Sequence, residues 1–71
     1  MRTRIQALRK KNKITQVELA AAVGVSRQTI ISIESEKYTA SLMLAYKIAS
    51  YFHLKIEDVF DFSEAEPHEK T

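Results

Sequence analysis

The sequence contains no cysteine and no tryptophan, and only one glycine and one proline among its 71 residues. Without cysteine, the fold has neither a disulfide nor a thiolate metal site. The scarcity of glycine and proline, and the lack of a long alternating run of β-branched residues, favour an all-α fold. Because no apolar run approaches the ~20 residues of a membrane span, and none follows the basic start, we expect a cytoplasmic protein without a membrane partner.

A chain of this length forms one small domain with a thin core, which is marginally stable alone. We expect the ordered domain to cover residues 1–62. Residues 63–71 are polar and hold the only proline, so they predict a disordered tail. Helix packing and a partner subunit are the remaining sources of stability.

Charge is distributed unevenly along the chain. Residues 1–38 carry a net charge of +5 and residues 39–71 carry −3, within a total of +2. A basic first half and an acidic second half of the sequence are typical of a protein that places one face on phosphate, although two ordinary solvated surfaces give the same pattern.

Apolar periodicity predicts five helices. The first covers about 2–11, with Ile5 and Leu8 inward, and the fifth is a short turn over 56–60. The fourth begins near Thr39 and ends near His53. Its expected apolar stripe consists of Leu42, Ala45, Ile48, Ala49 and Phe52.

The second and third helices have the clearest boundaries. The second begins at Thr15, which forms a capping box with Glu18, and ends at Gly24, which suits a left-handed cap. Ser26 is the N-cap of the third helix, which continues to about Ser35. Two helices joined so tightly through a glycine predict a helix-turn-helix.

The third helix has two distinct faces at about 100° per residue. Ile30 and Ile33 point inward, whereas the outer face carries Arg27, Gln28, Ile31, Ser32 and Ser35. Arginine and glutamine make bidentate hydrogen bonds to guanine and adenine, and an isoleucine suits a thymine methyl group. The outer face therefore suits base recognition, while a plain amphipathic helix with a polar outer face remains the alternative.

The sequence resembles the Cro/CI-type (XRE-type) helix-turn-helix repressors over about residues 1–60, and is most similar to the small stand-alone prokaryotic regulators. The resemblance implies a five-helix, lambda-repressor-like DNA-binding domain without a cofactor. The matching segments are Thr15–Ala20, Val23–Ile30, Ile33-Glu34, Lys37-Tyr38, Ser41-Leu42, Ala45, Lys47–Ala49 and Ile56–Phe60.

The resemblance also implies roles for individual residues. Arg27, Gln28 and Ser32 match positions that face base edges in the major groove. Ile31 is a further candidate for a base contact, because it lies on the same outer face of the third helix. The implied phosphate contacts are Gln16, Lys37 and Tyr38, with Ser26 and Lys10 as further candidates. Arg9 and Glu34 match a structural salt bridge between the first and third helices. Weaker phosphate candidates are Arg2, Arg4, Lys11 and Lys13.

Two positions depart from the family pattern. Ser35-Glu36 stands where the family usually has Asn-Gly, so we expect the loop after the third helix to follow another path. Glu36 also places an acid beside Lys37 and Tyr38. Ala40 replaces a proline that often opens the fourth helix, with little expected consequence.

Apolar side chains are crowded near the end of the domain. We expect Leu54, Ile56, Val59, Phe60 and Phe62 to form a dimer interface, since one small core has little room for them. Alternatively, they close the monomer core. The alternation in Phe60-Asp61-Phe62 also allows a short strand that pairs with its two-fold mate.

The leading hypothesis is a nucleoid-associated transcriptional regulator, of the repressor kind, that binds double-stranded DNA at an inverted repeat as a homodimer. The alternative is the DNA-binding antitoxin of a toxin–antitoxin pair, with the tail holding the toxin protein. An enzyme is not expected, because there is no nucleophile–base pair, no phosphate-binding glycine loop and no metal-ligand motif. We therefore expect no small-molecule substrate, cofactor or metal.

Overall fold

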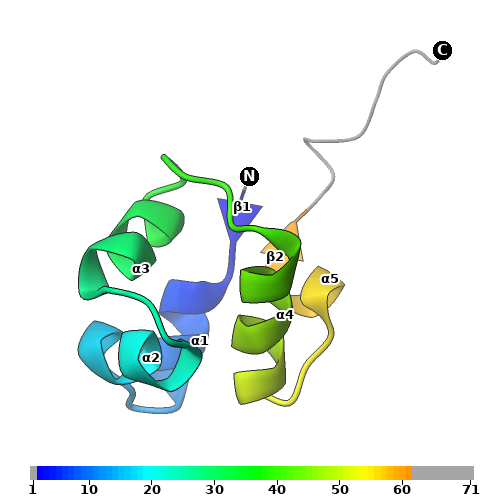
Figure 1. Cartoon of the computed structure of the whole chain (residues 1–71). Helices are drawn as coiled ribbons and strands as arrows, with labels where there is room; N and C mark the ends of the chain where they lie inside the picture. Colours follow the sequence, from blue (N-terminus) through cyan, green and yellow to red (C-terminus); the bar gives the residue numbers. More distant parts are fainter. Residues whose placement is uncertain (1, 62–71) are drawn as a thin grey trace, which may run out of the picture.

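A computed structural model describes residues 2–61, which form a small helical domain with a short two-stranded sheet (Figure 1). Five helices are present in this part of the chain, as expected. The elements in chain order are β1 (Arg2–Thr3), α1 (Ile5–Lys11), α2 (Gln16–Val23), α3 (Arg27–Glu34), α4 (Leu42–Tyr51), α5 (Ile56–Val59) and β2 (Phe60–Asp61). The expected tail, 63–71, lies outside the described residues, as does Phe62.

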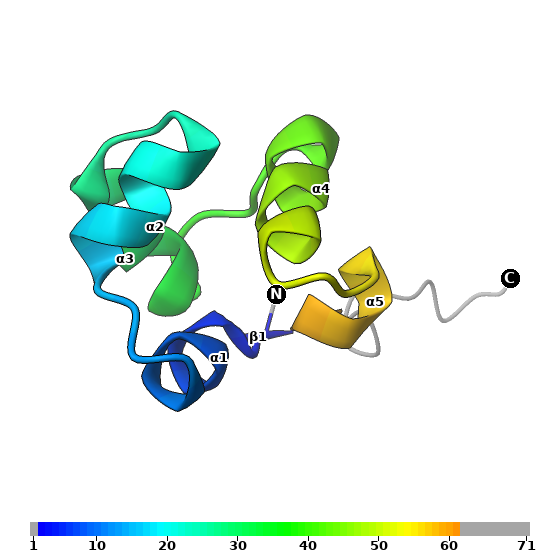
Figure 2. The same cartoon turned by 90° about the horizontal axis from the view of Figure 1, so that it is seen from below.

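The two ends of the domain pair with each other in an antiparallel sheet (Figures 1 and 2). Arg2 lies opposite Asp61 and Thr3 opposite Phe60, and the Arg4 N–H donates to the Val59 carbonyl at 2.7 Å. The sequence allowed a short strand at Phe60 paired with its two-fold mate, but the strand pairs with the N-terminus of the same chain. The expectation of a helix at residues 2–4 was therefore wrong. Arg2 and Thr3 are extended, because residues 2–4 pair through backbone hydrogen bonds with residues 59–61, whose backbone groups need partners.

Helix α4 is shorter than expected, and its buried side differs from the expected stripe in the first turn. Ser41, not Thr39, is its N-cap, and the Ser41 hydroxyl accepts a hydrogen bond from the Leu44 N–H at 3.2 Å. Leu44 is buried, whereas Leu42 is 78% exposed, so Leu42 was wrongly assigned to the core stripe. The buried residues of α4 are Leu44, Ala45, Ile48 and Ala49.

Four helices are followed, within two residues, by a residue in the left-handed conformation. These residues are Lys13, Gly24, Glu36 and His53, with φ of 58°, 79°, 65° and 59°. After each of them, the next N–H donates to a carbonyl five residues earlier, as in Val25 to Ala20 at 3.0 Å and Lys37 to Ser32 at 3.0 Å. The loop at Glu36 therefore keeps a glycine-like, left-handed backbone, and the expectation of another path was wrong.

Replacing Glu36 with glycine should stabilise the domain. A side chain in the left-handed region costs about 1–2 kcal/mol, partly offset by the greater freedom of glycine in the unfolded chain. We expect a net gain of about 1 kcal/mol and a Tm higher by roughly 4–8 °C, measured by circular dichroism. Glu36→Gln is the matched control, because it removes the charge and keeps the Cβ atom. An equal rise in both variants would show that charge, not backbone strain, is responsible.

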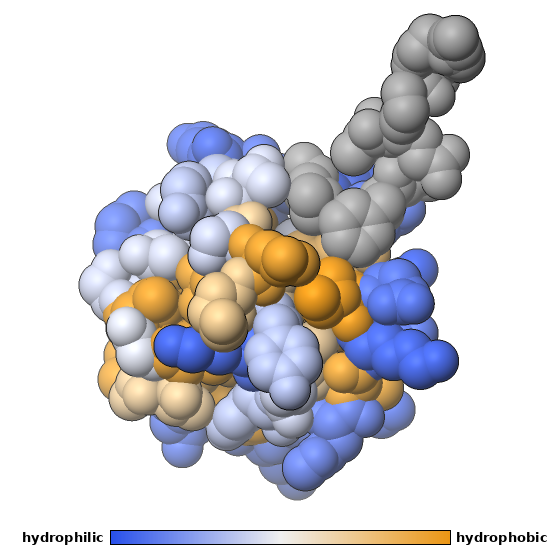
Figure 3. Space-filling view, turned by 45° about the vertical axis from the view of Figure 1, so that its right-hand side comes forward, coloured by the Kyte–Doolittle hydropathy of each residue, from blue (hydrophilic) through white to orange (hydrophobic). Residues whose placement is uncertain are grey.

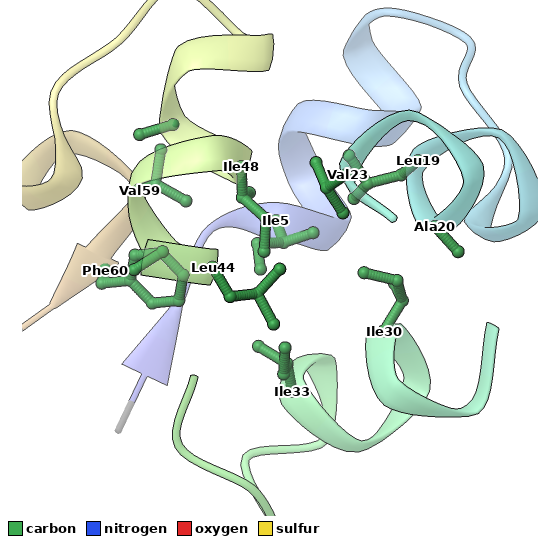
Figure 4. Packing of buried hydrophobic residues seen from close by; sticks show 12 residues of the cluster. Ile5, Leu19, Ala20, Val23, Ile30, Ile33, Leu44, Ile48, Val59 and Phe60 are labelled. Atoms are coloured by element: carbon green, nitrogen blue, oxygen red, sulfur yellow. The ribbon is translucent and has the colours of Figure 1, made fainter. Parts of the chain in front are cut away.

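The core is a single cluster of buried apolar side chains from the five helices and β2, and Figure 4 shows its packing. Ile30 and Ile33 are 0% and 1% exposed and project from α3 towards the other helices, as expected. The cluster consists of Ile5, Leu19, Ala20, Val23, Ile30, Ile33, Leu44, Ala45, Ile48, Ala49, Val59 and Phe60. Because α3 is fixed through one face, its opposite face is free for contacts outside the domain.

Candidate nucleic-acid interface

The turn between α2 and α3 is fixed by caps on both sides. The Thr15 hydroxyl accepts the Glu18 N–H at 3.0 Å, and the Glu18 carboxylate accepts the Thr15 N–H at 2.8 Å, which completes the expected capping box. Gly24 ends α2 in the left-handed conformation. The Ser26 hydroxyl then caps α3 by accepting the Thr29 N–H at 3.2 Å. The expected helix-turn-helix is therefore present.

The first turn of α3 presents its polar side chains outward. Arg27 and Gln28 are exposed, while Ile31 and Ser32 are half-buried on the following turn. The N–H groups of Arg27 and Gln28 have no partner within the helix, because they precede its first backbone hydrogen bonds. The N-terminus of α3 thus offers an arginine, a glutamine and a partial positive charge together.

An open hollow of about 550 Å³, here called the basic groove, lies at the N-terminus of α2. It contains three exposed cations, of which Lys13 was only a weak phosphate candidate in the sequence. Its lining residues are Arg9, Lys10, Lys13, Ile14, Thr15, Gln16, Val17 and Arg27. The N-terminal N–H groups of α2 and these cations make the groove suitable for an anion such as phosphate.

Arg9, Glu34 and Gln16 connect the first three helices beneath the basic groove. The Arg9 Nε and Nη2 atoms donate to the two Glu34 carboxylate oxygens at 2.5 and 3.1 Å, so the expected salt bridge is present. The Gln16 Nε2 donates to the same carboxylate at 3.1 Å, a contact that the sequence did not indicate. These side chains fix α3 relative to α1 and α2.

The environment of Arg9 keeps its guanidinium charged. The hydrogen bond that Arg9 donates to Glu34 raises the pKa of Arg9 above its ordinary value. Burial opposes this shift, and the Glu34 charge reinforces it. The Arg9 Nη1 also donates to the Ile14 carbonyl at 3.0 Å. Only 11% of the Arg9 side chain is exposed, so its role within the domain is structural.

A second, smaller hollow of about 220 Å³, here called the polar hollow, lies on the other side of the first turn of α3. Its side chains are hydroxyls and one amide, without a charge: Ser26, Gln28, Thr29, Ser32 and Tyr38. Tyr38 was expected near the DNA backbone, but it lines the same hollow as Gln28 and Ser32. Lys37 is exposed but lines neither hollow.

The expected dimer residues do not form one surface. Val59 and Phe60 are 0% and 1% exposed inside the monomer, so assigning them to an interface was wrong. Pairing of β2 with β1 holds them in the core. Leu54 is exposed and Ile56 is half-buried. A partner could therefore reach only these two of the four expected residues that the structure describes.

Within residues 2–61, no three His, Cys, Asp or Glu side chains gather as metal ligands would. None of the helices between these limits combines the length and apolar character needed to cross a bilayer. The weak phosphate candidate Arg4 donates through Nη1 to the Asp58 carbonyl at 3.1 Å.

Comparison with known proteins agrees with this geometry. The helix-turn-helix family model matches residues 5–59. An HTH-type transcriptional regulator of Archaeoglobus fulgidus is 57% identical over 70 residues, which cover 99% of each chain. The immunity repressor protein of Bacillus phage phi105 is 34% identical over 56 residues, covering 79% of this chain and 39% of the repressor.

Among solved structures, a chain of the SinR protein/SinI protein complex superposes with a TM-score of 0.74 at 25% identity. The match covers 93% of the present chain and 66% of that one. The capped turn, the outward face of α3, the family match and the near full-length relative agree. The chain belongs to the Cro/CI-type (XRE-type) helix-turn-helix family of DNA-binding transcriptional regulators.

Proposed function

We propose that this protein is a transcriptional repressor that binds an inverted repeat in duplex DNA as a homodimer, with α3 in the major groove. The observation that carries the proposal is the exposed pair Arg27 and Gln28 at the N-terminus of α3, between the basic groove and the polar hollow. The cationic side suits phosphate, and the neutral side suits base edges.

Base recognition is assigned to four side chains of α3. Arg27 and Gln28 have the geometry for bidentate hydrogen bonds to guanine and adenine. Ser32 lies one turn further along, and Ile31 supplies an apolar contact for a thymine methyl group. Tyr38 extends this surface, because it lines the polar hollow with Gln28 and Ser32.

Phosphate binding is assigned chiefly to the basic groove. Lys10 and Lys13 supply charge, and the second N–H of the Gln16 amide is available after the first has bonded Glu34. Lys37 follows α3 and suits the opposite flank of the DNA backbone. The Ser26 hydroxyl is the weakest of these candidates, since its oxygen already caps α3.

Two parts of the proposal, dimeric binding and repression, are supported by different observations. A single domain with one recognition helix contacts few base pairs, so a two-fold dimer with half-sites about 34–36 Å apart would give useful affinity. The similarity to a phage immunity repressor supports repression. The antitoxin alternative depended on the tail 63–71, which lies outside the described residues.

Arg27→Ala and Gln28→Ala should each weaken binding to the specific site by about 1–3 kcal/mol, or roughly 5- to 150-fold. Each variant should also lose the preference for one base pair, because a bidentate contact is removed. Fluorescence anisotropy with labelled duplexes that carry single base-pair changes measures both effects. Lys55→Ala is a suitable control, since Lys55 is exposed and lines neither hollow.

Gln16→Ala should instead weaken binding to all sequences by a similar factor, because a phosphate contact carries no sequence information. Unchanged affinity and unchanged base preference in both α3 variants would overturn the assignment of α3 as the recognition helix. A loss confined to one sequence in Gln16→Ala would contradict its phosphate role.

A further inference from the structure

The first part of the chain carries an unbalanced positive charge. Residues 1–17 contain no aspartate or glutamate, and their cations are Arg2, Arg4, Arg9, Lys10, Lys11 and Lys13. Arg9 is neutralised by Glu34. Lys10, Lys11 and Lys13 are exposed, and none of them forms an ion pair with another residue in the range 2–61. Positive charge is therefore concentrated at the end of α1, beside the basic groove.

The elements around the groove do not balance this charge. Helix α1 has no acid in its first turn and three cations in its last turn. Lys10 and Lys13 line the groove, and the N-terminus of α2 adds a partial positive charge. Exposed charges act over about 10 Å at 0.1 M salt. Any anionic segment of the same chain that reaches this distance is therefore attracted to the groove.

The tail 63–71 carries the opposite charge. Its charged residues are Glu64, Glu66, Glu69 and Lys70, so its net charge is −2 with histidine neutral. It has no large apolar side chain that could bury itself in a core. Carboxylates spaced two or three residues apart along an extended segment can each approach a separate lysine. The tail and the basic groove are thus complementary in charge.

Pairing of β1 with β2 brings these two segments within reach of each other. Asp61 lies opposite Arg2, and β1 leads directly into α1 (Figures 1 and 2). With about 3.3 Å per extended residue, 1.5 Å per helical residue and 5 Å between strands, Lys10 lies within about 25 Å of Asp61. Glu69 follows Asp61 by eight residues, so the backbone alone spans about 26 Å between them. The tail is therefore long enough to reach the basic groove.

We infer that the tail 63–71 binds the basic groove when DNA is absent, and that it competes with DNA phosphates for Lys10 and Lys13. The inference rests on the proposed function, because it assigns a regulation to the same phosphate-binding site. A duplex carries a denser row of negative charge and displaces the tail. Because the groove contacts phosphates and not bases, the tail lowers the affinity for all duplexes by a similar factor.

The main alternative surface for the tail is apolar. Figure 3 brings one face of the molecule forward, and orange, hydrophobic atoms gather near the centre of the view. Leu42, Met43 and Tyr46 are 78%, 62% and 59% exposed, and they line a hollow with Ile56. None of these four side chains is a cation, and residues 63–71 have no large apolar side chain to place there. Charge complementarity therefore favours the basic groove.

A variant with Glu64→Gln, Glu66→Gln and Glu69→Gln, here called the triple-glutamine variant, removes the negative charge and keeps the length of the tail. It should bind every duplex about three- to tenfold more tightly at about 50 mM salt, as measured by fluorescence anisotropy. Its binding should also depend more steeply on salt. Each phosphate neutralised adds about 0.9 to the slope of log affinity against log salt, so the slope should steepen by about 2.

The groove lysines provide the control. In a Lys10→Gln/Lys13→Gln background, the same three glutamate changes should raise affinity less than twofold, because the tail has lost its binding site. In a Lys47→Gln background the gain should persist, since Lys47 is exposed on α4 and does not line the basic groove. A gain of equal size with and without the groove lysines would show that the tail repels DNA without binding the groove, and would overturn the inference.

Nuclear magnetic resonance without DNA tests the contact itself. The backbone amide signals of residues 10–16 should differ between the wild type and the triple-glutamine variant at low salt, while those of α4 should not. The difference should disappear near 1 M salt, where charges act over only about 3 Å. Identical signals for residues 10–16 at low salt would overturn the inference. Absence of DNA binding by the wild type would overturn the proposed function instead, and these signals would still decide whether the tail binds the groove.

Discussion

The Ile30→Ala variant is expected to lose about 2–5 kcal/mol of unfolding free energy, the usual cost of a large-to-small change in a core. The Ile30 side chain is fully buried and packs inside the single core, where the surrounding helices can only partly fill the space it leaves. A domain of this size has only a few kcal/mol of stability. The variant should therefore be largely unfolded at its working temperature.

Ile31→Ala is the matched control, because the same side chain at the next position is only half-buried on the outer side of α3. It should lose much less stability than Ile30→Ala and should weaken DNA binding instead. Urea unfolding followed by circular dichroism measures the difference. Equal losses of stability in the two variants would show that α3 does not present its faces as described.

Glu34→Ala is expected to cost about 3–5 kcal/mol, the range found when one partner of a buried ion pair is removed. The Arg9 and Glu34 side chains are only 11% and 7% exposed. The change leaves the Arg9 guanidinium with its hydrogen bond to the Ile14 carbonyl and removes the acceptor of the Gln16 amide. Because the three side chains join α1, α2 and α3, the loss should also loosen the recognition helix.

The double variant Arg9→Met/Glu34→Leu should recover most of that stability, since well-packed apolar residues often replace a buried ion pair without loss. Thermal unfolding of the single and double variants measures both effects. A cost below about 1 kcal/mol for Glu34→Ala would place the pair among ordinary surface salt bridges. Because the pKa of Arg9 is raised, the ion pair contributes its full stabilisation at pH values below the ordinary pKa of arginine. This stabilisation is lost only as the pH rises above the pKa of Arg9 in the folded protein.

The turn at the centre of the fold could be predicted because its signals are local. Thr15, Glu18, Gly24 and Ser26 each act through backbone groups within three to five residues, so their spacing is sufficient to place the helix ends. Lys13, Glu36 and His53 follow three other helices in the same left-handed conformation as Gly24. Residue preference does not indicate this conformation there, because side chains other than glycine rarely adopt it.

The errors in the sequence analysis concern contacts between distant segments. Burial of Phe60 depends on the pairing of β2 with β1, nearly sixty residues away along the chain. The sequence did not distinguish Leu42 from Leu44, because residues 42–45 are all apolar and only the packing of the other helices decides which of them is buried.

In the candidate site, too, some side chains could be placed from the sequence and others could not. The outward placement of Arg27 and Gln28 could be predicted from helical periodicity, since Ile30 and Ile33 mark the buried side of α3. The addition of Tyr38 to the polar hollow and of Lys13 to the basic groove could not. Lys13 itself has the left-handed conformation and Tyr38 follows left-handed Glu36, so both positions depend on that backbone conformation.

Selection of bound sites from random duplex DNA at near-physiological salt directly measures whether α3 reads a sequence. We expect one inverted repeat with half-sites about one helical turn apart. With the Gln28→Ala variant, we expect the preference to be lost at one base pair in each half-site. Retention of DNA without a common sequence, or no retention at all, would contradict the claim that α3 reads DNA sequence as a dimer.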